Sequence, residues 1–424
     1  MKRLESLFTL MLIFLMLAIC LPAVGAPLQS TSGNISGDIF GRKNRIFHPS
    51  IMVSGEYTDN LYNSYTDEDE DFITVISPKL TLAFPGTDET EIRINTATGA
   101  PGGLMLSRDM LETTNRFQGI LSYTPEFEIY SDNTDENFTR QTLQGAFQYN
   151  APGGLTLDIA DQYRKDQEMR GEIGNQTGEE FESNLANGAV KYEFSPKFSI
   201  GANVTAYAVS YSTDTADFRD RNDTAVGGAF YYNITEKTEI FTEYKYIDVS
   251  YDAAVSADRE NTEDQILAGI TWRMTTKSRG TCKIGYAEKD FEGAGVDDPT
   301  GWYAELNAAH KFTTRTMLQL GAVHRFSETN LSTSAYYTTD AANMVYSQEL
   351  TPKLQCRGAI RYSVDDYDGV DLELKNFGVR PSVAFLPYRW LTIDLAYDYE
   401  KRDATIDILD YTTNSVILSV DATF

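Results

Sequence analysis

The chain has 424 residues and a formal net charge of −26, and its aromatic residues include 26 Tyr and 22 Phe. This acidity argues against a nucleic-acid partner, because phosphate recognition requires a basic face. Only two of the three cysteines, Cys282 and Cys356, lie beyond residue 26, so the sequence does not encode a disulfide-rich scaffold.

Residues 1–26 have the pattern of a cleaved secretory signal. Lys2 and Arg3 precede a short apolar stretch that ends in small residues, which predicts cleavage near Ala26. A retained membrane anchor is the alternative, and it would need a longer apolar stretch. Residues 27–45 follow as a polar periplasmic N-terminal leader, in which no core-forming pattern is present.

From residue 46 to residue 424, apolar and polar residues alternate along segments bounded by turn residues. Between Phe198 and Tyr207, for example, the apolar side chains recur at every second position, which is the period of a β-strand. Residues 85–118 interrupt this rhythm, and we interpret them as an irregular insertion that forms a long turn, a partial plug or an extra hairpin.

Short turns of one composition recur along this region, starting at residues 195, 235, 275, 313, 351 and 386, which are 35 to 40 residues apart. Long acidic connections such as "STDTADFRDRN" lie between them. Short turns at one end and long loops at the other are typical of transmembrane barrels, whereas a propeller of similar period needs short connections throughout. We therefore predict an all-β, closed, antiparallel up-and-down transmembrane β-barrel of about 18 strands, within a range of roughly 16 to 20.

In lipid, side chains that face outward are apolar and side chains that face the lumen are wet. Strand parity then predicts polar lumen-lining residues of both charges. The main candidates are Asp158, Arg164, Asn203, Tyr207, Lys283, Glu305, Asn307, Gln319, Arg325, Arg357, Arg361, Asp394 and Asp398. Any one of them either contacts a solute or only hydrates the lumen and pairs with its neighbours, and these alternatives stay open.

Other residues were considered as enzyme or metal sites. His324 and Ser327 fall on opposite faces of a strand, which disfavours a catalytic pair. Asp67, Asp69 and Asp71 alternate in the first long loop, where a solvated acidic loop is a simpler interpretation than a calcium site. We predict that the protein is not an enzyme and has no catalytic, cofactor-binding or metal site. By the same parity, Cys282 and Cys356 are free, lipid-facing thiols.

The last strand has an outward apolar stripe that ends on an aromatic side chain. This stripe consists of Val416, Leu418, Val420, Ala422 and Phe424. It resembles the signal that the outer-membrane barrel assembly machinery reads, so we expect that machinery to be a partner.

One segment, "HPSIMVSGEYTDNLYNSYTDEDEDFITVISPKLTLAF", resembles the opening of a family of β-barrel porins of Gram-negative outer membranes, found with exopolysaccharide synthesis and export systems. The similarity rests on Gly55, on Thr58 to Tyr62, on Asp71 to Ile73 and on Ile76 to Leu80. Residues 119–150 resemble the next hairpin of that family. The resemblance covers residues 47–84 and 119–150, and the remainder is similar only in rhythm.

This resemblance implies a barrel of about eighteen strands in the outer membrane, surrounded by its lipids and working beside a periplasmic polysaccharide-export component. The expected function is a passive aqueous conduit for an exopolysaccharide. A general diffusion porin for small hydrophilic solutes and a surface adhesion or matrix-binding barrel are the alternatives. The resemblance supplies no catalytic residues.

Overall fold

The computed structural model describes residues 25–26, 46–66, 68–86, 116–168, 178–275, 277–293 and 296–424. Most of the expected signal and leader segments, Asp67 and most of the 85–118 segment lie outside these residues. Among the described residues, no helix is long and apolar enough to cross a membrane.

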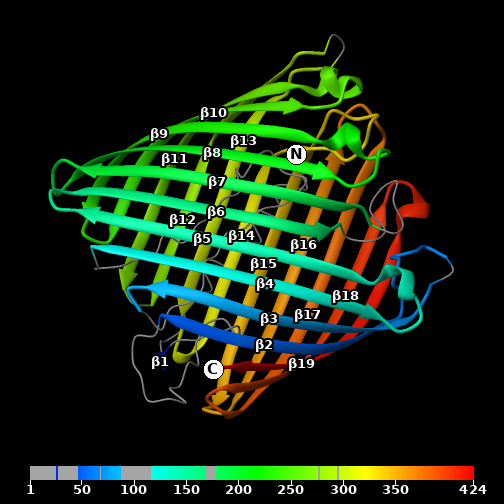
Figure 1. The fold of residues 1–424 in the computed structure, drawn as a ribbon. Coiled ribbons are helices and arrows are strands. Elements are labelled where there is room, and N and C mark those ends of the chain that lie inside the picture. Colours follow the sequence, from blue (N-terminus) through cyan, green and yellow to red (C-terminus); the bar gives the residue numbers. More distant parts are fainter. Residues whose placement is uncertain are drawn as a thin grey trace.

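Eighteen antiparallel strands, β2 to β19, form one closed barrel, which confirms the predicted fold (Figure 1). Each strand pairs with the next along the chain, and β19 pairs with β2 to close the ring. A two-residue strand, β1 (Gly25–Ala26), pairs with the start of β14.

The strand bounds are β2 (Phe47–Thr58), β3 (Asp71–Phe84), β4 (Phe117–Tyr130), β5 (Phe138–Ala151), β6 (Leu155–Gln167), β7 (Glu180–Glu193), β8 (Phe198–Tyr211), β9 (Arg221–Thr235), β10 (Thr238–Tyr251), β11 (Asn261–Thr275), β12 (Ser278–Phe291), β13 (Thr300–Lys311), β14 (Thr314–Glu328), β15 (Tyr336–Thr351), β16 (Leu354–Tyr367), β17 (Leu372–Tyr388), β18 (Leu391–Ala404) and β19 (Tyr411–Thr423).

One type of hydrogen bond explains why Ser and Thr recur in the short turns. In four of them a Ser or Thr hydroxyl accepts a hydrogen bond from the backbone N–H two residues later, a local bond that favours tight turns. The four pairs are Ser195 with Lys197, Thr235 with Lys237, Thr313 with Arg315 and Thr351 with Lys353. The turn between β5 and β6 instead uses Gly153 and Gly154, whose φ angles are +98° and +88°.

The opposite end of the barrel, called the mouth here, carries the longer connections, with four short 3-10 helices. These are η1 (Thr134–Glu136), η2 (Asp217–Arg219), η3 (Ala254–Arg259) and η4 (Asp407–Leu409). Asp71, the first residue of β3, accepts hydrogen bonds from the backbone N–H groups of residues 131, 132 and 133, in the loop that contains η1. Its carboxylate therefore ties two neighbouring mouth loops together.

The two faces of the wall differ in exposure as strand parity predicts. On the outer face, large apolar side chains such as Ile200, Ile266 and Leu418 are 48–65% exposed. Such a band of apolar side chains around the outside of a closed barrel fits contact with lipid.

The inner face is not uniformly polar. Near the mouth it carries buried apolar clusters, one built from Leu185, Tyr207, Val209 and Tyr211 with their neighbours and another from Ala225, Ile247, Val249 and Tyr251. The barrel therefore has a packed core just below the mouth, where the expectation from parity was a wet wall.

Candidate functional site

Three sectors of the inner wall carry charged networks. In the first, Arg140 on β5 lies between carboxylates of the two flanking strands. Its Nη1 lies 2.6 Å from Oε1 of Glu128 on β4, and its Nε bonds Asp166 on β6. Arg164, a predicted lumen residue, pairs with the same Asp166. Three carboxylates, those of Glu126, Glu128 and Asp166, thus share two guanidinium groups.

The second sector lies on β10, β12 and β13. The Lys283 ammonium is 3.3 Å from Oε2 of Glu243. Glu305 accepts hydrogen bonds from the Asn307 amide at 2.7 Å and from the Tyr303 hydroxyl at 3.2 Å. Three of the predicted lumen residues, Lys283, Glu305 and Asn307, therefore lie in one sector and bond to their neighbours.

The third sector lies on β16, β17 and β18. Arg361 Nη2 is 3.0 Å from Oδ1 of Asp398 and also pairs with Glu400, while Arg380 Nη1 is 3.3 Å from Oδ2 of Asp398. Although both arginines are on the inner face and paired, their side chains remain 43% and 44% exposed. Solvent therefore reaches this part of the lumen.

A cavity of about 360 Å³ opens beside the third sector, on the wall formed by β13 to β19. Its lining includes Asn307, Asn343, Arg361, Asn376, Glu400 and Arg402. Arg402 donates from Nε to the Asn376 carbonyl at 2.9 Å and lies over the Tyr411 ring at 4.9 Å. The cavity thus presents polar groups held in place by their own neighbours.

The hairpin of β14 and β15 departs from the barrel wall. The pairing of β14 with β13 ends at His324, whereas its pairing with β15 continues for four more residues, to Glu328. Beyond that departure, Phe326 and Tyr336 pack against Leu267, Ala287 and Tyr303, which belong to the inner faces of β11, β12 and β13. The end of the hairpin therefore folds into the mouth and rests on the inside of the wall.

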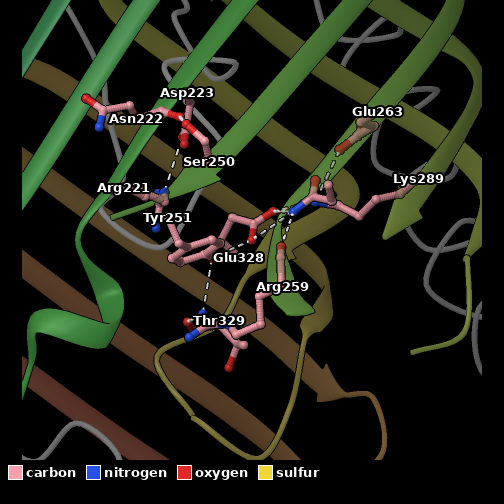
Figure 2. Close-up of polar contacts among 11 residues, drawn as sticks. Arg221, Asn222, Asp223, Ser250, Tyr251, Arg259, Glu263, Lys289, Glu328 and Thr329 are labelled. Carbon is pink, nitrogen blue, oxygen red and sulfur yellow. Dashed lines mark hydrogen bonds and ion pairs between the residues drawn. The ribbon is translucent and has the colours of Figure 1, made fainter. Parts of the chain in front are cut away.

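A buried polar group, called the mouth cluster here, holds this hairpin (Figure 2). Glu328 pairs with Lys289 on β12 and accepts a hydrogen bond from the Tyr251 hydroxyl on β10 at 2.7 Å. Both Glu328 and Lys289 have an exposure of 0%. Arg259, from η3, donates to the Thr329 carbonyl at 2.6 Å and to Tyr251 at 3.1 Å. Four elements at the mouth, β10, η3, β12 and β14, are thereby joined.

The other predicted lumen residues also lie on the inner-face parity, in different surroundings. Asp158 and Tyr207 are only 2% and 4% exposed, so neither lines open water: Asp158 lies near the short-turn end of β6, and Tyr207 packs below the mouth. Asn203, Gln319, Arg357 and Asp394 are half-buried, as is Arg325, whose Nε and Nη1 are buried without a hydrogen-bond partner among the described residues. Whether any of these side chains contacts a solute stays a prediction.

Sequence reasoning missed the mouth cluster. Glu328 falls on the outward parity of β14, and only the departure of β14 from β13 brings that face against the inner wall. The one available signal was the presence of charged residues, Lys289 and Glu328, at the ends of strands that otherwise look membrane-embedded. Strand parity alone could not predict this ion pair, because Lys289 and Glu328 come from β12 and β14, which are not adjacent in the sheet.

His324 and Ser327 lie on opposite faces of β14, as strand parity predicts. His324 stacks on Trp302 with ring centroids 3.8 Å apart, and its Nδ1 is 2.8 Å from Oδ1 of Asp340. Ser327 bonds instead to Thr339 on the inner side. Among the described residues, no group of three or more His, Cys, Asp or Glu side chains is placed to hold a metal ion. Cys282 and Cys356 are both free thiols.

The last strand has the expected alternation. Val416, Leu418, Val420 and Phe424 are 39–51% exposed, while Ser415 is buried. Phe424 donates its backbone N–H to the Pro49 carbonyl at 2.9 Å, and its ring stacks on Trp390 at 6.4 Å. Whether the assembly machinery reads this stripe stays a prediction.

Comparison with known proteins connects this barrel to porins. A family model described as "Putative beta-barrel porin 2" matches residues 115–424, which are 310 of the 424 residues. No curated protein matches the sequence.

Three solved structures are similar over most of their length. OccAB4 of Acinetobacter baumannii has a TM-score of 0.46 and 9% identity, with 90% of this chain and 99% of that chain covered. The outer membrane protein OpdK of Pseudomonas aeruginosa has a TM-score of 0.44 and 12% identity, covering 89% and 99%. A BenF-like porin of Pseudomonas fluorescens Pf-5 has a TM-score of 0.44 and 9% identity, again covering 89% and 99%.

Proposed function

The chain belongs to the β-barrel porin family that matches residues 115–424, and on this premise we propose that it is a passive aqueous conduit for exopolysaccharide export. The conduit lies in the outer membrane of a Gram-negative bacterium. Its proposed partners are the membrane lipids, the barrel assembly machinery, a periplasmic polysaccharide-export component and the polymer itself.

The main support for this proposal is the solvent exposure of two arginines on the inner face. A guanidinium inside a sealed barrel would be desolvated, and such burial is costly unless every donor is paired. Arg361 and Arg380 retain 43% and 44% exposure. The lumen therefore contains water around these two arginines, and we propose that a hydrophilic solute passes through that water.

The balance of charge on the inner wall supports a polymer as cargo. In the third sector each arginine is matched by a carboxylate, so the wall there carries no excess charge that would hold a charged segment of a passing chain. The resemblance of residues 47–84 to porins found with exopolysaccharide systems points the same way.

A general diffusion porin for small hydrophilic solutes is the second candidate. The inward-folded hairpin of β14 and β15 favours it, because a segment that crosses the mouth narrows the path for a wide polymer. Deletion of the gene separates the two: a conduit mutant loses surface polysaccharide while small-solute uptake stays normal. Loss of small-solute uptake with intact surface polysaccharide would favour the second candidate.

Conductance tests the channel itself. Purified protein in a planar lipid bilayer should give discrete current steps in potassium chloride. A properly folded barrel that gives no current would overturn both candidates and leave the adhesion or matrix-binding role.

A further inference from the structure

The cavity in the wall of β13 to β19 is organised by a single row of the sheet. Asn307, Gly321, Asn343, Arg361, Gly378 and Glu400 are successive partners across β13, β14, β15, β16, β17 and β18. Side chains in one such row point to the same face of a sheet, and here that face is the lumen.

The two glycines in this row let the neighbouring side chains lie flat on the wall. A Cβ atom added at Gly321 would lie 2.1 Å from Oδ1 of Asn343, and one added at Gly378 would lie 2.5 Å from Nε of Arg361. The Asn343 amide therefore leans over Gly321 and the Arg361 guanidinium over Gly378. The result is a shallow depression whose rim consists of planar polar groups.

The depression carries no net charge. Its lining contains the cations Arg361, Lys401 and Arg402 and the anions Glu305 and Glu400, and without Lys401, which pairs with Asp403, two cations face two anions. The outer cation, Lys401, is on the opposite parity of β18. Arg361 already pairs with Glu400, and Arg402 already donates to the Asn376 side chain and lies over the Tyr411 ring. An anionic ligand would have to compete with these partners for either cation.

One side-chain amide of the depression, that of Asn343, has free hydrogen-bonding groups. Among the described residues, the side chain of Asn343 makes no hydrogen bond, so its amide oxygen and its NH₂ group are both available, while its backbone belongs to the ladders of β15 with β14 and β16. An amide offers a donor and an acceptor in one plane, and two adjacent hydroxyl groups, each a donor and an acceptor, match that pair.

From these observations we propose that the depression is a binding subsite for a neutral, hydroxyl-rich sugar unit, and that the cargo is a neutral rather than an acidic polysaccharide. This inference rests on the proposed function. Its volume of about 360 Å³ is at the lower end of ligand-binding pockets, as expected for a transient contact on a transport path.

Interruption of ion current by added oligosaccharide tests the subsite. The full-length processed barrel is reconstituted in planar bilayers, and maltohexaose or a galacturonate hexamer is added at increasing concentration. Maltohexaose should interrupt the current in a saturable manner, and galacturonate should do so at least about tenfold more weakly, because its charges are not compensated in the depression.

Two variants disturb the depression in different ways. Asn343→Ala removes the free amide, and Gly321→Ala forces that amide out of its place. Each should weaken the maltohexaose block about five- to tenfold, which corresponds to the loss of one or two hydrogen bonds. Because the two changes differ in size and strand, a fold defect common to both is improbable, and heat-modifiable migration on gels checks folding of each.

A matched pair of controls lies on another part of the wall. Asn203 on β8 leans over Gly227 on β9, since a Cβ added at Gly227 would lie 2.9 Å from its Nδ2, and neither residue lines the cavity. Asn203→Ala and Gly227→Ala should therefore leave the maltohexaose block unchanged.

The outcomes separate this inference from the proposed function. Three results, each obtained with normal conductance, would overturn the subsite and leave the conduit intact. They are no block by maltohexaose, an equal or stronger block by galacturonate, and equal effects of the two pairs of variants. Absence of conductance from folded barrels overturns the conduit, and the subsite falls with it.

Discussion

Glu328, the last residue of β14, forms an ion pair with Lys289 on β12 in which neither side chain has any exposed surface. The pair joins two strands that are not neighbours in the barrel, because β13 lies between them. It fixes the end of the β14–β15 hairpin to the inside of the wall.

Removal of one partner should release the hairpin. Lys289→Met leaves the Glu328 carboxylate buried without its cation, which costs about 3 to 5 kcal/mol for a buried pair. We expect larger and noisier single-channel currents, because the hairpin then samples positions away from the wall. The double variant Lys289→Met with Glu328→Leu should recover quiet currents, and continued noise in it would show that the ion pair does not hold the hairpin.

Charge removal in the first sector should alter ion selectivity. Arg140→Gln leaves the carboxylates of Glu128 and Asp166 without their shared cation. Removing a unit charge about 10 Å from an ion in water changes the energy of that ion by about 0.4 kcal/mol, which favours potassium and disfavours chloride about twofold each. The ratio of potassium to chloride permeability should therefore rise about fourfold. Reversal potentials in a salt gradient measure this ratio. Arg140→Lys, which keeps the charge, should leave it near the wild-type value.

The two cysteines report which face of the wall meets lipid. Cys282 and Cys356 are free and lie on the outward parity of β12 and β16. In barrels embedded in vesicles they should react with a membrane-soluble maleimide and resist a charged, water-soluble one. Asn203→Cys, on the inner face, should show the reverse preference, and rapid labelling of the native cysteines by the charged reagent would contradict the assignment.

The hydroxyl bonds in the short turns should contribute a modest, additive stability. Thr313→Ala removes the acceptor for the Arg315 backbone N–H, a bond of 2.9 Å. The expected loss is about 0.5 to 1.5 kcal/mol in free energy of unfolding, measured by urea titration in detergent or lipid. Thr313→Ser keeps the hydroxyl and should retain most of the stability.

Phe424 should matter for assembly more than for the finished barrel. Phe424→Ala removes the ring that stacks on Trp390 but keeps the backbone bond to Pro49. If the assembly machinery reads the outward stripe of the last strand, the variant should accumulate as unfolded precursor in the cell and yet refold normally in detergent. Equal losses in both settings would indicate a packing role alone.

Much of the architecture could be predicted from the sequence because a barrel strand obeys a local rule. The hydrophobic period of two that begins at Phe198 corresponds to β8 (Phe198–Tyr211), and the short turns that start at residues 195 and 235 join β7 to β8 and β9 to β10. The strand number and the closed topology followed from the same rhythm.

The mouth could not be predicted in this way, since it depends on where one strand leaves its neighbour. His324 is the last β14 residue paired with β13, and nothing in the local pattern marks it as a point of departure. Asp158 and Tyr207 illustrate the same limit: parity assigns them to the inner face, but only packing shows that they are covered.

The closure of the barrel between β2 and β19 has a consequence for how the chain folds. All other pairings of the eighteen strands join consecutive strands, so each connection is far shorter than the chain. This seam pairs Ser50 with Thr423 and Thr58 with Ser415, residues separated by more than 350 positions. The entropy of closing so long a loop is offset only after the intervening hairpins have formed. We therefore expect the β2–β19 pairing to form last. Until it forms, the unpaired edges of β2 and β19 can hydrogen-bond to strands of other proteins.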